Sequence, residues 1–229
     1  MPLLPGVACL ETLSYQADMG PDEEAKHMYF GTLLGVGPHL KRMEPQMRVE
    51  YQAGISHRLM LLKASPLSAV PILIISELET ILPLLFASEF PQVLAHGDFS
   101  KTNILVNPDT YEITGVVDWS LAAVQPLGIE LDSLFLMTGY LGLNGWQDYT
   151  CRPRLWEAFW TEFWVVSGIE DDGGLRRENV RSMAEKAAKI GAILRYAFNR
   201  KADGGPSEVL STSDAMLRMP KAWLDVKAI

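Results

Sequence analysis

Three polar residues near the middle of the chain have the types and the spacing that phosphoryl transfer uses. Asp98 follows His96 and Gly97, Asn103 comes five positions after Asp98, and Asp118 ends a later run of β-forming residues. An Asp and an Asn at this spacing in a loop, with a second Asp beyond a nearby hairpin, is the arrangement that phosphoryl transfer requires. Singly, each could be a turn, cap or strand-end residue. It is improbable that all three residues occur at this spacing only because they suit turns, caps and strand ends.

Each of these residues then has an expected task. Asp98 would accept the proton of a substrate hydroxyl, or orient that hydroxyl, as it attacks the γ-phosphorus of ATP. The side-chain oxygens of Asn103 and Asp118 would hold the magnesium ions that bridge the ATP phosphates. We interpret His96 as a structural residue that hydrogen-bonds within the loop, because the base is already Asp98. Lys101 could contact the γ-phosphate, although a single lysine in a loop is more often solvated.

Short strands are predicted on either side of these residues. The helix predicted over Ser76–Phe90 is broken by Pro91, and Val93–Ala95 should form a strand before the loop. Ile104–Val106 and Ile113–Val117 are β-rich runs separated by turn-forming residues, which predicts a hairpin. Asp118 stands where the second strand of this hairpin ends.

Helices are predicted over most of the remaining chain. The segment Glu23–Lys63 mixes helix formers with isolated glycines. Aromatic residues spaced by three and four over Leu155–Val166 indicate a buried helix, and core packing is a more frequent role for such a stripe than lining a pocket. A second long helix should include Met183–Phe198 and end by Gly204–Pro206. The segment Ser207–Ile229 is expected to form one short helix.

The loop motif resembles that of a known family. HGD-x4-N at 96–103 followed by Asp118-Trp119 is similar to the aminoglycoside phosphotransferase and choline kinase-like family, where these motifs replace HRD and DFG of protein kinases. The hairpin length and the turn at Pro126–Gly128 also match. The stretch FPQVLAHGDFSKTNILV resembles family members predicted in filamentous fungi. Ser120 departs from the Glu or Gly often found in the family, which affects the expected loop conformation but removes no metal ligand.

The resemblance implies a fold and a domain arrangement. The fold would be α+β and mainly helical, a protein-kinase-like C-terminal lobe in which a small β-hairpin carries the catalytic and metal loops. Residues 12–229 would form this lobe, and Asp132 would be the buried Asp that braces the catalytic loop. Residues 1–11 would be a remnant of the interlobe hinge, with Leu3 and Leu4 at the adenine. The N-terminal lobe, with its phosphate-pairing lysine, would be largely missing.

Two functions from different classes follow from this interpretation. The first is an ATP- and magnesium-dependent phosphotransferase, truncated, that acts on a small-molecule hydroxyl. The alternative is a catalytically impaired, pseudokinase-like binding module, or a lobe repurposed for another reaction. The retained Asp and Asn residues favour the first, and the missing lysine favours the second. The acceptor is not identified, since Trp146, Trp156 and Trp160 could face either substrate or core.

Composition and charge restrict the partners. The 229 residues include 20 basic and 28 acidic ones, and the net charge of -8 argues against nucleic acid. Two distant cysteines, Cys9 and Cys151, indicate neither a disulfide framework nor a zinc site. Neither a signal peptide nor a membrane span is predicted, so a cytoplasmic protein is expected. Surface uncovered by a missing lobe could be covered in a homodimer or by a partner.

Overall fold

The computed structural model describes residues 5–12, 16–36, 40–66, 70–143, 145–170, 175–201 and 206–212. The chain divides into two compact units. The first unit combines Met1–His39, Ala95–Ala123 and Ser133–Glu170, and the second combines Leu40–Leu94, Val124–Asp132 and Asp171–Ile229. In the described ranges, no helix combines the length and the apolar character needed to cross a membrane.

A three-stranded antiparallel sheet in the first unit contains the predicted hairpin. Its order is β1 (Val7–Ala8), β3 (Ile104–Val106) and β4 (Ile113–Val116). Ile104 pairs with Val116, so the start of β3 faces the end of β4. The connecting turn is closed by the Asn107 side chain, whose Oδ1 accepts hydrogen bonds from two backbone N–H groups. This turn fixes which ends of the two strands meet.

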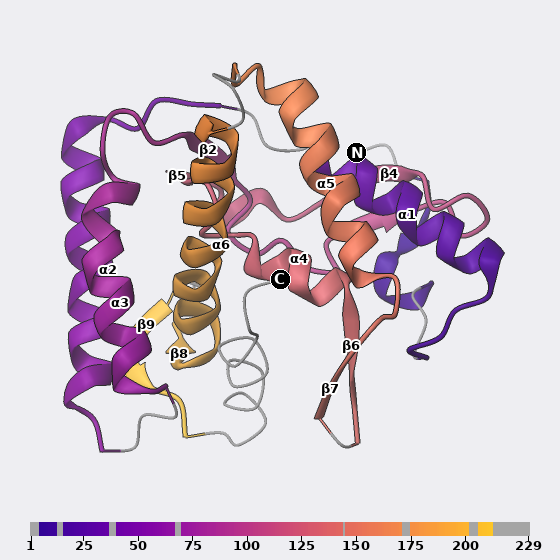
Figure 1. The fold of residues 1–229 in the computed structure, drawn as a ribbon. Coiled ribbons are helices and arrows are strands. Elements are labelled where there is room, and N and C mark those ends of the chain that lie inside the picture. Colours follow the sequence, from indigo (N-terminus) through magenta and orange to yellow (C-terminus); the bar gives the residue numbers. More distant parts are fainter. Residues whose placement is uncertain are drawn as a thin grey trace. The chain divides into compact units, whose positions relative to one another are not determined.

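Two helices and a second hairpin complete the first unit. Helix α1 (Pro21–Val36) packs against α5 (Arg152–Ser167). Between the sheet and α5 the chain forms α4 (Asp132–Met137) and a hairpin of β6 (Gly139–Gly142) and β7 (Gly145–Asp148), visible in Figure 1. This second hairpin is not among the elements expected from the sequence.

Most of the aromatic side chains of α5 are buried, as their spacing predicts. Trp156 and Trp160 are 2% and 1% exposed, and Phe163 is fully buried. The rings of Trp160 and Phe163 meet edge-on, with their centroids 5.5 Å apart. Of the three tryptophans that sequence could not assign, only Trp146 on β7 is partly exposed.

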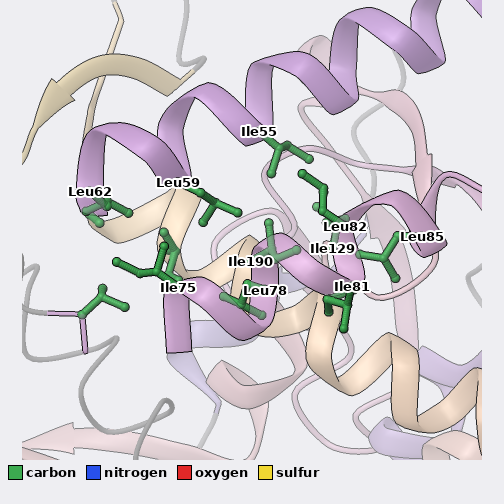
Figure 2. Close-up of a cluster of buried hydrophobic side chains, with 14 of the residues drawn as sticks. Ile55, Leu59, Leu62, Ile75, Leu78, Ile81, Leu82, Leu85, Ile129 and Ile190 are labelled. Carbon is green, nitrogen blue, oxygen red and sulfur yellow. The ribbon is translucent and has the colours of Figure 1, made fainter. Parts of the chain in front are cut away.

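The second unit is built around three helices. Helix α3 (Ile72–Leu85) packs against both α2 (Pro45–Ala64) and α6 (Leu175–Tyr196). Figure 2 shows their apolar side chains meeting in one cluster, in which the labelled residues are Ile55, Leu59, Leu62, Ile75, Leu78, Ile81, Leu82, Leu85, Ile129 and Ile190. Within α2 and within α3, the members of this cluster are spaced by three and four, which places them on one face of each helix.

A glycine permits the closest approach in this unit. A Cβ atom at Gly191 of α6 would fall far inside van der Waals contact with the carbonyl oxygen of Ile129. The absence of a side chain at Gly191 therefore lets the backbone at Ile129 lie directly against α6.

Two small sheets also form. One pairs β2 (Gln92–Ala95) with β5 (Ala123–Pro126), and the other pairs β8 (Phe198–Arg200) with β9 (Pro206–Leu210).

Three predicted segments need correction. Residues 207–210 of the predicted terminal helix belong to β9, and the rest of that prediction, 213–229, lies outside the described residues. The long helix ends at Tyr196, because Phe198 pairs with Leu210 instead of continuing the helix. Helix α3 runs over Ile72–Leu85 rather than 76–90: it begins directly after Pro71, and the segment after Leu85 forms tight i→i+3 turns.

Candidate active site

The predicted catalytic loop connects β2 to β3. It starts at His96, directly after β2, and ends at Asn103, directly before β3. Asp118 follows β4 by two residues. Because Ile104 pairs with Val116, Asn103 and Asp118 lie at the same end of the hairpin.

Val117 is held by the catalytic loop on both sides of its backbone. Its N–H donates to the carbonyl of Asn103 at 2.9 Å. Its carbonyl accepts a hydrogen bond from Nε2 of His96 at 2.7 Å. Asp118 therefore follows a residue whose N–H and C=O are both fixed by the loop that carries Asp98.

His96 connects the two loops through both of its ring nitrogens. Since Nε2 faces the Val117 carbonyl, it must carry the proton, and Nδ1 is then an acceptor. The backbone N–H of Asp98 donates to Nδ1 at 3.3 Å. The ring is buried, and its centroid is 4.7 Å from the Trp119 ring. The neutral imidazole thus links the backbone of Asp98 to the residue preceding Asp118.

Asn103 is fixed by its amide nitrogen. Nδ2 donates to the backbone carbonyl of Asp98 at 2.9 Å and lies 3.4 Å from an oxygen of the Asp98 carboxylate. With the nitrogen used in this way, Oδ1 is the side-chain atom suited to a metal ion. The two residues predicted as base and ligand are therefore in contact.

Asp118 has an unusual backbone conformation. Its φ of 60° and ψ of 59° place it in the left-handed region, which is unfavourable for a residue with a side chain. One carboxylate oxygen, Oδ1, accepts a hydrogen bond from Oγ of Ser120 at 2.8 Å. Ser120, the departure from the family pattern, therefore orients the predicted metal ligand.

Gly97 allows the catalytic loop to approach the segment after Asp118. Its φ is +82°, and a Cβ atom there would collide with the carbonyl oxygen of Leu121 in the short helix η2 (Trp119–Leu121). Both the backbone angle and the lack of space require glycine at this position.

Lys101 points to the second hairpin. Its Nζ donates to the carbonyl of Gly139 at 3.0 Å. Burial of the side chain lowers its pKa from 10.5 to about 8, although the nearby Cys9 thiol acts in the opposite direction. The lysine is thus largely removed from solvent, and the predicted contact with a phosphate remains a prediction.

Asp132 belongs to the other compact unit. Asp132, in the second unit, is buried, and its Oδ2 accepts a hydrogen bond from Nε of Arg195 on α6 at 2.6 Å. Its bracing of the catalytic loop stays a prediction. Leu3 and Leu4, predicted at the adenine, are outside the described residues.

The donor set fits magnesium better than a transition metal. The ranges that the structure describes contain no group of three or more His, Cys, Asp or Glu side chains that could hold a metal ion by themselves. Magnesium needs no such cage, because one or two protein oxygens usually hold it together with water and substrate phosphates. Oδ1 of Asn103 and the carboxylate of Asp118 are donors of this kind.

Comparison with known proteins identifies the family of the chain. No curated protein matches the chain. The model of the APH family, described as "Phosphotransferase enzyme family", matches residues 41–161, a range that contains the catalytic loop and Asp118. As this match covers more than half of the 229 residues, the chain belongs to the APH phosphotransferase family.

Proposed function

We propose that this protein transfers a phosphoryl group from ATP to the hydroxyl of a small molecule. The observation that carries the proposal is the double attachment of Val117 to the catalytic loop, through Asn103 and His96. It places the residue predicted as base and the two predicted ligands in one hydrogen-bonded structure within one unit.

Each side chain then has one task. Asp98 would accept the proton of the acceptor hydroxyl, and its backbone is held by His96 and Asn103. Oδ1 of Asn103 and the carboxylate of Asp118 would hold magnesium, which when bound supplies positive charge that neutralises the ATP phosphates. Ser120 would keep the Asp118 carboxylate oriented before ATP arrives.

The first experiment is a thermal-shift measurement with ATP and magnesium together. A ligand that binds the native state raises the free energy of unfolding by mass action, by about 2.7 kcal/mol when it is present at about 100 times its Kd. The melting temperature rises as a result. We expect a magnesium-dependent shift for the wild type and its loss in Asp118→Asn. Asp109→Asn, the same change at an exposed position in the β3–β4 turn, should keep the shift. The absence of any shift for the wild type at millimolar ATP would refute a nucleotide site.

A second variant separates binding from chemistry. Asp98→Asn removes the proposed base while the backbone contacts of residue 98 can remain. We expect it to retain the ATP shift but lose transfer by about 100-fold or more, measured as ADP release with a panel of hydroxyl compounds. A wild type that binds ATP but phosphorylates no compound of the panel would favour the binding-module alternative.

A further inference from the structure

A buried arginine in the first unit has hydrogen-bond donors that the described chain does not satisfy. Arg152 is the first residue of α5, and its side chain is 5% exposed. Nη1 donates to the carboxylate of Asp148 on β7. Nε and Nη2 are buried, and the part of the chain that the structure describes offers neither of them a hydrogen-bond partner.

A second such donor lies one helical turn further along α5. The indole N–H of Trp156 is also buried, and no acceptor for it occurs in the described ranges. Residues four apart share a helix face, and long helical side chains lean toward the N-terminus, which brings the Trp156 indole back toward Arg152. Both side chains pack on Phe135, with the guanidinium carbon 5.1 Å and the indole centroid 5.2 Å from the Phe135 ring centre.

All of the unsatisfied groups on this helix face are donors. Buried polar groups in native proteins nearly always have hydrogen-bond partners, and a buried cationic donor without one is especially unfavourable. Within the described part of the chain, what Arg152 and Trp156 lack is therefore an acceptor. A carboxylate or phosphate oxygen suits a guanidinium edge best, since it can accept two parallel N–H hydrogen bonds.

We propose that Arg152 and Trp156 form a binding site for an oxyanion, the carboxylate or phosphate group of a small molecule. The N-terminus of a 16-residue helix adds its positive end to the same place. The inference does not depend on phosphoryl transfer.

The site is connected to the catalytic loop through the second hairpin. Asp148, which holds Arg152, pairs with Gly139 across the β6–β7 ladder. The carbonyl of Gly139 accepts the hydrogen bond of Lys101 from the catalytic loop. An anion that shifts Asp148 would therefore act on the strand to which the catalytic loop is attached.

Asp148 has a second role in the proposal, as a competitor. Its carboxylate is 47% exposed and accepts hydrogen bonds from Arg152 and from the Trp146 indole at 2.7 Å. The Asp148 carboxylate repels an incoming anion, so removal of the Asp148 charge should strengthen anion binding. Asp148→Asn is thus expected to bind anions more tightly than the wild type.

The test is calorimetric titration of the full chain with inorganic phosphate, and separately with acetate, at constant ionic strength. We expect one saturable site in the wild type for at least one probe, loss of binding in Arg152→Met, and about 3- to 10-fold weaker binding in Trp156→Phe, which keeps an aromatic ring but lacks the N–H. Arg154→Met is the matched control, because this 63% exposed arginine lies two positions away on the same helix. It should bind as the wild type does.

Two results would overturn the proposal. One is a folded wild type that binds neither probe, which would mean that internal water satisfies the donors. The other is equal binding by the wild type, Trp156→Phe and Asp148→Asn, which would place the anion elsewhere. If Arg152→Met fails to fold, the comparison of the wild type with Trp156→Phe and Asp148→Asn still tests the proposal.

Discussion

Lys101 should make the stability of this protein depend on pH in a way that one substitution removes. The lysine side chain is largely buried and its pKa is lowered from 10.5 to about 8. Between these two pH values the unfolded chain keeps the proton on Lys101 while the folded chain has released it. Because the unfolded state then binds more protons, the free energy of unfolding rises with pH over this range.

The size of the effect follows from the same shift. A shift from 10.5 to about 8 corresponds to about 3 kcal/mol, since each pKa unit is worth about 1.4 kcal/mol. Solvent reaches part of the side chain, so we expect about 1 to 3 kcal/mol. Burial also raises the pKa of the neighbouring Cys9 thiol from 9.0 to about 12, so this group lowers the free energy of unfolding as pH rises above about 9. Because Cys9 is present in the wild type and in a Lys101 variant alike, the comparison of the two proteins isolates the contribution of Lys101.

The assay is urea unfolding of the wild type and Lys101→Met at about pH 7 and about pH 10. Methionine fills similar space without a charge. Relative to the variant, the wild type should gain about 1 to 3 kcal/mol as pH rises, because all other lysines and tyrosines titrate alike in both proteins. Lys41→Met removes an exposed lysine and controls for the general loss of a positive charge. A difference between the wild type and Lys101→Met that stays constant with pH would show that Lys101 is not buried as described.

Two further substitutions test packing and the link between the loops. Gly191→Ala forces a Cβ atom into the Ile129 carbonyl and should cost about 3 kcal/mol in urea unfolding. Gly54→Ala on α2, where the added Cβ makes only an ordinary contact with the Arg58 side chain, should instead gain up to about 1 kcal/mol. Equal effects of the two would contradict the close approach. His96→Phe leaves the Val117 carbonyl without its donor and should cost about 1 to 3 kcal/mol and reduce the ATP-induced thermal shift. An unchanged thermal shift would argue against a role of the His96–Val117 hydrogen bond in holding the nucleotide site.

Local sequence signals were sufficient for the elements next to the site. The turn residues at 107–110 between two β-rich runs predicted the β3–β4 pair, because turn chemistry and strand propensity agree there. The aromatic spacing predicted α5 to within a few residues. The pair Asn144-Gly145, typical of a two-residue hairpin turn, is the local sequence signal for the β6–β7 hairpin.

The remaining features depend on contacts between distant parts of the chain. The Lys101 bond to Gly139 spans 38 residues, and no local pattern indicates that a loop lysine will be buried by a hairpin formed later. Strand β9 exists because Leu210 pairs with Phe198, a long-range partner that propensity within 207–229 cannot supply. The spacing of Asp98, Asn103 and Asp118 predicted their tasks, but not the double attachment of Val117 that connects them.

The left-handed backbone of Asp118 has a consequence for how this protein can change over time. Glycine would adopt that conformation without the cost of about 1 kcal/mol that a side chain incurs. Replacement of Asp118 by glycine would therefore relieve this backbone strain, but it would also remove the proposed magnesium ligand. The stability of the backbone at residue 118 and the proposed magnesium site thus make opposite demands on the same residue, a trade-off that is typical of functional positions.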